Sequence, residues 1–87
     1  MLEYFVYAIK SKKDGRIYVG MSTNPEKRLK EHNTGEVFST KGFTPWIPIF
    51  LENCGLDRKQ ARIREKYWKS GIGKEKLKSK HSGVAQR

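Results

Sequence analysis

The fold of this chain rests on residues 4–21, YFVYAIKSKKDGRIYVGM, which contain two short stretches of strand-forming residues. Residues 4–9 and 16–21 are rich in aromatic and β-branched side chains, which pack well on a pleated sheet. Asp14-Gly15 stands between them, and this dipeptide tolerates the backbone of a tight hairpin turn. The pattern predicts an antiparallel hairpin. Because residues 4–9 are nearly continuously apolar, we expect both faces of that strand to be covered, or one face to line a site.

A short helix is predicted directly after the hairpin, over roughly 25–34. Asn24 can accept a hydrogen bond from a backbone amide of the first turn, and Pro25 has the fixed φ angle that suits the first helical position. The helix contains one aliphatic residue, Leu29, so it has little apolar surface to bury and weak stability of its own. We infer that something other than core filling constrains its sequence.

The second half of the chain continues with a loop, a strand and a helix. Residues 34–45 are rich in Gly, Ser, Thr and Lys, which is typical of an exposed loop. Residues 46–51 predict a third strand, in which Pro48 has no amide hydrogen and should lie at a sheet edge or at a bulge. A second helix is predicted over roughly 58–70, with Asp57 as its cap.

The helix over 58–70 has an apolar side and a basic side. We expect the core side to consist of Leu56, Ile63 and Tyr67, adjoined by Ala61 and Trp68. The opposite side carries Arg58, Lys59, Arg62, Lys66 and Lys69. Such runs are often only solvated, but they also suit contacts with phosphate. Glu65 lies at the seam between the two sides and is the one carboxylate between Asp57 and Glu75.

Three strands and two or three helices predict a compact α/β (α+β) sandwich, a three-stranded antiparallel sheet flanked by helices. We place the domain at residues 1–78, with a short last helix over 74–80. Residues 79–87 are polar and are predicted to form a disordered C-terminal tail.

Composition limits the function classes. The 87 residues make one domain, and hydrophobic residues reach only 36%. Lys and Arg number 19 against 9 Asp and Glu, a net charge of +10, which favours a polyanionic partner, nucleic acid first. A merely basic protein fits the charge as well. One cysteine excludes an internal disulfide and a cysteine-based zinc site. Without a membrane-length apolar run or a signal-peptide pattern, we expect a soluble cytoplasmic protein that does not bind membranes.

The strongest candidate site combines the hairpin with the first helix. The hairpin can bring Tyr7 and Tyr18 side by side, and Gly20 leaves room for a close approach. Arg28 and His32 are four residues apart and therefore share one face of the helix. Taken singly, each fits an ordinary role: core aromatics, a surface arginine, a histidine complementing the helix dipole. Only their joint occurrence favours a site.

The joint pattern resembles the GIY-YIG nuclease superfamily. Its motifs are matched in order by Phe5-Val6-Tyr7, Tyr18-Val19-Gly20, Arg28, His32 and Glu65. The segment from Asn24 to Asn33 is especially similar to the small stand-alone bacterial members, which consist of a single domain mostly without assigned function. The resemblance covers roughly residues 4–77, nearly the whole chain. It implies the three-stranded antiparallel fold and metal-dependent cleavage of phosphodiester bonds. It also implies catalytic roles for Tyr7, Tyr18, Arg28, His32 and Glu65, with Glu65 as the metal ligand.

These residue types suit that chemistry. The Arg28 guanidinium can donate two hydrogen bonds to a phosphate in a fixed geometry. One carboxylate is enough for Mg²⁺ or Mn²⁺, because Mg²⁺ keeps several waters and takes phosphate oxygens as ligands. A tyrosine has an ordinary pKa near 10 and acts as a base only if its surroundings lower that pKa. His32 could relay a proton instead.

The leading interpretation is a Mg²⁺-dependent endonuclease acting on DNA, either weak by itself or dependent on a partner. Arg28 and the basic residues Arg58, Arg62, Lys66 and Lys69 would contact the nucleic acid. The first alternative is a non-catalytic DNA- or RNA-binding protein that keeps the site without turnover. A second alternative is a basic scaffold that docks on an acidic protein. DNA is favoured over RNA, and the oligomeric state stays open.

Overall fold

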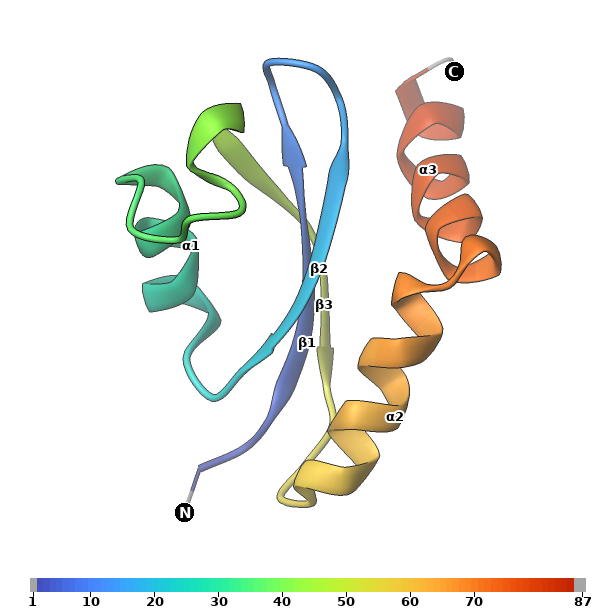
Figure 1. The fold of residues 1–87 in the computed structure, drawn as a ribbon. Helices are drawn as coiled ribbons and strands as arrows, with labels where there is room; N and C mark the ends of the chain where they lie inside the picture. The colour runs from blue at the N-terminus through green and yellow to red at the C-terminus, as the bar shows by residue number, and fades with distance from the viewer. Residues whose placement is uncertain (1, 86–87) are drawn as a thin grey trace.

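A computed structural model describes residues 2–85, and the side chains of residues 2–79. In chain order its elements are β1 (Phe5–Ser11), β2 (Ile17–Ser22), α1 (Pro25–Asn33), the short 3-10 helix η1 (Lys41–Phe43), β3 (Trp46–Asn53), α2 (Arg58–Lys69) and α3 (Gly71–Ala85). The strands form one antiparallel sheet in the order β2-β1-β3. Helix α1 and η1 lie on one side of the sheet, and α2 and α3 lie on the other (Figure 1). The predicted α+β architecture is confirmed.

Strand pairing follows the predicted hairpin. In the β1–β2 register Tyr7 lies opposite Gly20, and Ile9 lies opposite Tyr18. Tyr7 and Tyr18 are thus diagonal neighbours on the sheet rather than a directly opposed pair. Strand β3 is an edge strand, and its pairing with β1 shifts register between Ala8 and Ile9, next to Pro48. Both expectations for this proline, an edge strand and a bulge, are confirmed.

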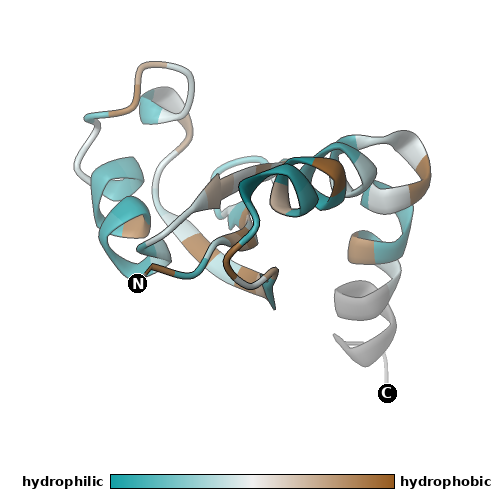
Figure 2. Cartoon of the chain, turned by 90° about the horizontal axis from the view of Figure 1, so that it is seen from below, coloured by the Kyte–Doolittle hydropathy of each residue, from teal (hydrophilic) through white to brown (hydrophobic). Residues whose placement is uncertain are grey.

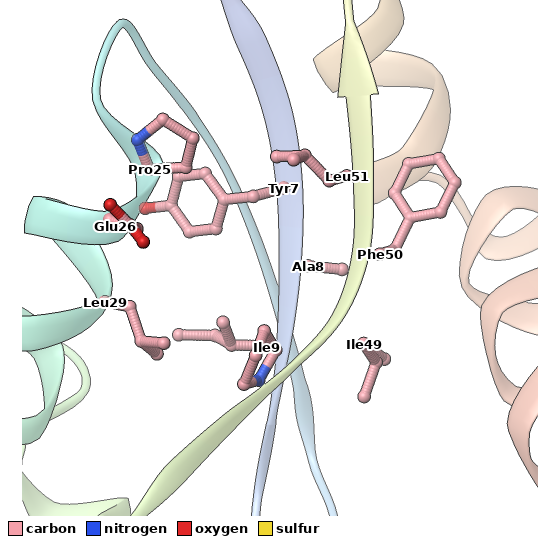
Figure 3. Close-up of a pocket in the computed structure, with 10 residues that line it drawn as sticks. Tyr7, Ala8, Ile9, Pro25, Glu26, Leu29, Ile49, Phe50 and Leu51 are labelled. Atoms are coloured by element: carbon pink, nitrogen blue, oxygen red, sulfur yellow. The ribbon is translucent and has the colours of Figure 1, made fainter.

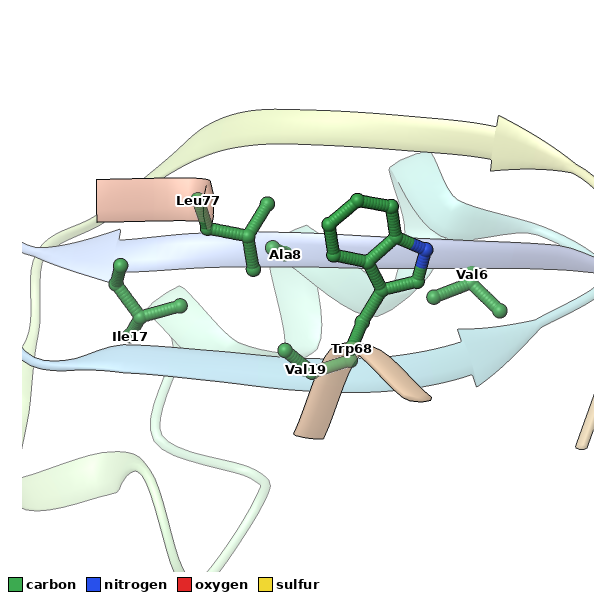
Figure 4. Packing of buried hydrophobic residues seen from close by; sticks show 6 residues of the cluster. All are labelled: Val6, Ala8, Ile17, Val19, Trp68 and Leu77. Carbon is green, nitrogen blue, oxygen red and sulfur yellow. The ribbon is translucent and has the colours of Figure 1, made fainter. Parts of the chain in front are cut away.

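The central strand β1 is buried on both faces, as its continuous apolar sequence predicted. The face toward α2 and α3 carries one cluster, formed by Val6, Ala8, Ile17, Val19, Trp68 and Leu77 (Figure 4). The face toward α1 carries a second cluster, with Tyr7, Ile9 and Trp46 buried and Tyr18, Leu29 and Phe43 packed against them. The second cluster contains both candidate tyrosines, so the site is built into the core on the α1 side.

The predicted core side of α2 is confirmed for Ala61 and Trp68, with Tyr67 half-buried against the core, and is wrong for Leu56 and Ile63. Leu56 and Ile63 are 55% and 57% exposed, whereas Ala61, Glu65 and Trp68 are buried. Trp68 is drawn to the sheet by polar as well as apolar contacts. Its indole Nε1 donates to a carboxylate oxygen of Glu52 on β3, 2.8 Å away, and its ring lies 4.5 Å from that of Phe50. This anchoring turns the helix so that Glu65 faces inward.

Helix α3 begins directly after the cap of α2 and is longer than the helix predicted over 74–80. A side chain at Gly73 would meet the carbonyl oxygen of Tyr67, so only glycine allows the two helices to pack this closely. The helix enters the range 79–87 in which we predicted a tail, and residues 86 and 87 lie outside the described residues. Within the part of the chain that is described, none of the helices combines the length and apolar character of a membrane span.

Candidate active site

The hydroxyl end of Tyr7 lies directly over the backbone of Gly20. A Cβ atom at Gly20 would come within 2.5 Å of the Tyr7 hydroxyl oxygen and 2.6 Å of its Cζ. The Tyr7 side chain is buried on the central strand, and moving its hydroxyl away from Gly20 would break its 2.9 Å hydrogen bond to His32. Glycine is therefore required at this position of β2, because it lets the tyrosine hydroxyl extend toward the free edge of the sheet.

Helix α1 contributes a buried histidine to this hydroxyl. The helix is almost entirely hydrophilic (Figure 2), and its buried residue is His32, while Leu29 is only half-buried. The Nε2 atom of His32 lies 2.9 Å from the Tyr7 hydroxyl, and its Nδ1 atom lies 2.7 Å from the hydroxyl of Thr40. The contact with Tyr7 explains why a helix with so little apolar surface occupies this place.

The contacts of Thr40 favour one tautomer of His32. The Thr40 hydroxyl has one proton, and the carbonyl of Val37, 3.3 Å away, can accept it. In that arrangement the hydroxyl accepts a hydrogen bond from His32, and the imidazole proton lies on Nδ1. The lone pair on Nε2 is left to accept the hydrogen bond that Tyr7 donates. Tyr7, His32 and Thr40 thus form a chain with a defined direction of proton donation.

The segment that contains Thr40 was predicted to be an exposed loop, which is wrong for this residue. Thr40 is buried, and its carbonyl accepts a hydrogen bond of 3.0 Å from the indole of Trp46. Asn33, at the end of α1, holds the same tryptophan through both backbone groups, at 2.6 and 3.0 Å. Nothing in the local sequence distinguishes Thr40 from its polar neighbours, so sequence reasoning missed it.

The pKa values of Tyr7 and His32 fit this direction of donation. Burial raises the pKa of Tyr7 to about 12; the nearby Tyr18 and Glu65 also raise it, and the Arg28 guanidinium opposes them. Burial also lowers the pKa of His32, with a further lowering by the Arg28 charge. The surroundings of Tyr7 therefore do not supply the lowered pKa that a tyrosine needs to act as a base by itself. Tyr7 is held protonated beside a neutral imidazole that can accept its proton.

Arg28 lies on the same face of α1, one turn before His32. A guanidinium nitrogen donates to the carboxylate of Glu31 over 2.7 Å, and Lys27 also pairs with that carboxylate, at 3.4 Å. The effect of Arg28 on the pKa of Tyr7 places its charge near the tyrosine hydroxyl. An arginine has five donors, so the contact with Glu31 leaves others for a phosphate.

Tyr18 completes the aromatic part of the site. Its ring lies edge-on to the His32 imidazole with centroids 4.9 Å apart, and 6.4 Å from the rings of both Tyr7 and Trp46. The side chain is half-buried, so part of it reaches solvent. The structure therefore places Tyr7 and Tyr18 near each other, as the hairpin predicted, and adds His32 to both rings.

Glu65 lies on α2, which covers the other side of the sheet from α1 (Figure 1). Its side chain is 8% exposed, and its two oxygens pair with Arg62 at 3.2 Å and Lys69 at 3.3 Å. Both cations are half-exposed, whereas the carboxylate is buried. Its charge raises the pKa of Tyr7, but less than burial and Tyr18 do.

The donor set around Glu65 fits a metal only in part. No group of three His, Cys, Asp or Glu side chains that could hold a metal ion occurs within residues 2–79. A lone buried carboxylate matches an ion such as Mg²⁺, which completes its shell with water and phosphate oxygens. One carboxylate would suit a metal site that the substrate completes, but both oxygens of Glu65 pair with cations in this structure.

The basic residues of α2 differ in their contacts. Arg64 is half-buried and pairs with Glu52 of β3 at 2.9 Å. The others are exposed, namely Arg58, Lys59, Arg62, Lys66 and Lys69. Among them, in the part of the chain whose side chains are described, only Arg62 and Lys69 pair with Glu65.

A pocket of about 520 Å³ also opens between α1 and β3, beside the Tyr7 ring (Figure 3). Its walls include the apolar side chains of Ile9, Leu29 and Leu51, and Glu26 is the one charged residue among those that line it in the described chain. Its lining offers no cation to a phosphate, and of the candidate catalytic residues it includes only Tyr7 within the described chain.

Comparisons with known proteins show the family to which the chain belongs. The family model of the GIY-YIG catalytic domain matches residues 3–78. A subunit of a structure-specific endonuclease from Xenopus laevis, slx1, is 38% identical over 52 residues, which cover 55% of this chain and 18% of that protein. The corresponding subunit from Mus musculus is 36% identical over 55% of this chain and 19% of its own length. The UPF0213 protein DP2720 of Desulfotalea psychrophila is 34% identical over 71% of this chain and 56% of its own length.

Proposed function

Because the chain belongs to the GIY-YIG family of catalytic domains, we propose that it is an endonuclease that hydrolyses phosphodiester bonds in DNA with Mg²⁺ or Mn²⁺. The chain of hydrogen bonds from Tyr7 through His32 to Thr40 carries this proposal. Similarity to subunits of structure-specific endonucleases supports DNA as the substrate, although the chain spans only about a fifth of their length. We expect it to act in the cytoplasm, weakly or with a partner.

The proposed reaction begins with a water molecule at the Tyr7 hydroxyl. As the water oxygen bonds to phosphorus, the water gives a proton to Tyr7, and Tyr7 passes its own proton to Nε2 of His32. The imidazole becomes a cation, and its Nδ1–H remains bonded to Thr40. This transfer avoids a free tyrosinate, which the raised pKa of Tyr7 makes unfavourable. The bond from phosphorus to the leaving oxygen breaks, and that oxygen takes a proton from solvent.

The charges of the site support the same reaction. We assign Arg28 to the phosphate oxygens, where its hydrogen bonds strengthen as negative charge builds up. Glu65 would hold the metal ion, which supplies positive charge at the phosphate. Arg62 and Lys69 neutralise Glu65 in this structure, and with a metal ion held by the carboxylate their charges would be left for the nucleic acid backbone.

A cleavage assay with a matched pair of variants tests the proposal. The purified protein is incubated with labelled duplex, flapped, branched and single-stranded DNA, with Mg²⁺ or Mn²⁺ and then with a chelator. Glu65→Gln keeps the size of the side chain and removes its charge, while Glu75→Gln makes the same change at an exposed position of α3. We expect metal-dependent cutting by the parent and by Glu75→Gln, and loss of cutting with intact DNA binding in Glu65→Gln.

A parent protein that binds DNA tightly at low salt and never cuts it would support the non-catalytic alternative. In that case affinity would fall steeply with salt, because phosphate contacts by Lys and Arg release counterions. Equal cutting by Glu65→Gln and Glu75→Gln would place the metal elsewhere.

A further inference from the structure

A polar pocket lies at the free edge of β2, next to the candidate active site. Its volume is about 520 Å³, and it is lined by Asp14, Arg16, Ile17, Tyr18, Ser39, Thr40, Trp46 and Lys74. We call it the hairpin pocket. Tyr18 and Thr40 belong both to this pocket and to the group around His32, so the two are continuous. Its lining is more polar than that of the apolar pocket beside α1.

Arg16 is held in one orientation at the wall of the hairpin pocket. Its guanidinium carbon lies 3.6 Å from the centre of the Phe43 ring, and its Nε donates to Asp14 over 2.8 Å. Within residues 2–79 the guanidinium makes no other hydrogen bond, so its terminal nitrogens keep their donors for another partner. An arginine fixed in this way loses little side-chain freedom when it binds an anion.

Lys74 brings a second positive charge to the pocket from α3. It is half-buried, and it forms no ion pair with any carboxylate in the described part of the chain. The one carboxylate that lines the pocket, Asp14, already pairs with Arg16. A half-buried ammonium without a partner favours an anion beside it, since a neighbouring negative charge offsets its partial loss of hydration.

The hairpin pocket and the Tyr7 hydroxyl lie along the same strand, β2. Gly20 and Tyr18 are two residues apart on this strand and so face the same side of the hairpin, and Arg16, two residues before Tyr18, continues the alternation. Arg16 directly precedes the strand, and its carbonyl still accepts a hydrogen bond from the amide of Ser11. At about 3.3 Å per residue, Arg16 lies about 13 Å along the strand from the glycine beneath the Tyr7 hydroxyl.

We infer that the hairpin pocket binds a second backbone phosphate of the nucleic acid strand whose scissile phosphate lies at Tyr7 and Arg28. The inference rests on the proposed function and adds a contact that fixes the strand along the edge of β2. Arg16 and Lys74 would hold the phosphate from two elements, with the hydroxyls of Tyr18 and Ser39 beside them. Binding at this pocket would position the strand on the hairpin side of the site, away from the basic surface of α2.

The test compares two lysines of the same helix. Lys74→Met and Lys76→Met remove the same charge and keep an unbranched side chain, but Lys76 is exposed and outside the pocket. Binding of a fluorescent DNA oligonucleotide is measured by anisotropy at several salt concentrations, with a chelator present so that no cleavage occurs. Thermal unfolding of both variants checks that they are folded.

We expect Lys74→Met to weaken binding about 10-fold, as loss of one charge-assisted contact implies. The slope of log affinity against log salt should become shallower by about 0.7–0.9, the effect of one phosphate contact. Lys76→Met should bind like the parent, and Lys74→Arg should restore binding. Inorganic phosphate at constant ionic strength should compete equally weakly with DNA on the parent and on Lys74→Met.

Equal DNA binding by Lys74→Met and Lys76→Met would overturn the inference. So would inorganic phosphate that competes with DNA more strongly on the parent than on Lys74→Met, because that result indicates a site for free phosphate. Because these measurements need no turnover, they are independent of whether the protein cuts DNA. A parent that binds and does not cut would refute the proposed nuclease while the lysine comparison still decides the pocket. A parent that binds no DNA at low salt would refute both.

Discussion

Gly20→Ala is the substitution whose effect follows most directly from the structure. The added methyl group would lie 2.5 Å from the hydroxyl oxygen of Tyr7 and 2.6 Å from its Cζ, distances at which atoms overlap. Tyr7 is buried on the central strand, so the ring cannot turn away without disturbing its neighbours. Overpacking of this kind destabilises a core by about 1–3 kcal/mol.

The lower conformational entropy of the unfolded chain partly offsets this destabilisation. Replacing Gly with Ala restricts the unfolded chain and stabilises a protein by about 0.4–1 kcal/mol where the backbone permits. Gly42 provides the matched control, because a Cβ there meets no atom within 4 Å and its backbone is not left-handed. We therefore expect a net loss of about 1–2 kcal/mol for Gly20→Ala and a small gain for Gly42→Ala. For a domain of this size the loss lowers Tm by about 4–16 °C.

Activity should fall more than stability. Displacing the Tyr7 hydroxyl breaks its 2.9 Å hydrogen bond to His32, and misplacing a reacting group by about 1 Å costs on the order of 100-fold in rate. Chemical denaturation and DNA cleavage well below Tm measure the two effects. Tyr7→Phe removes the hydroxyl without overpacking and should lose activity with a smaller change in stability. A Gly20→Ala protein as stable and as active as the parent would refute the close contact and the assignment of Tyr7.

Three further outcomes follow from the same site. Thr40→Val should move the imidazole proton of His32 away from Nδ1, which ¹⁵N NMR detects, and should slow cleavage. Thr40→Ser should keep the parent tautomer and the parent cleavage rate. An unchanged tautomer in the valine variant would show that Thr40 does not set it. Arg28→Ala should lower the cleavage rate about 100-fold and binding much less, with no rescue by Arg28→Lys, and an active Arg28→Ala protein would remove this residue from the site. The pKa of His32 is lowered in the folded protein, so its contribution to the free energy of unfolding is present above pH about 6.5 and is lost as the pH falls through the folded pKa. His32→Gln should therefore make the free energy of unfolding less dependent on pH across that window. The same pH dependence in both proteins would contradict the lowered pKa.

Local signals in the sequence were enough for most of the fold. The hairpin was predictable because the Asp14-Gly15 turn and the strand-forming residues on either side act over a few positions. Helix α1 was predictable from the cap at Asn24, whose side chain accepts from the amide of Lys27. The spacing of Arg28 and His32 placed both on one face of this helix for the same local reason.

Only the tertiary structure decides which residues of the site contact one another. Tyr7 and His32 are 25 residues apart, and the proton on Nδ1 depends on Thr40, which lies in a polar segment without any period. The inward face of α2 was mispredicted for a similar reason: Glu52 on β3 bonds to Trp68 and turns Glu65 toward the sheet. A helical pattern reports how apolar each side is, but a hydrogen bond from another element can outweigh that difference. These contacts exist only once the chain has closed its long loops, and so no local pattern specifies them.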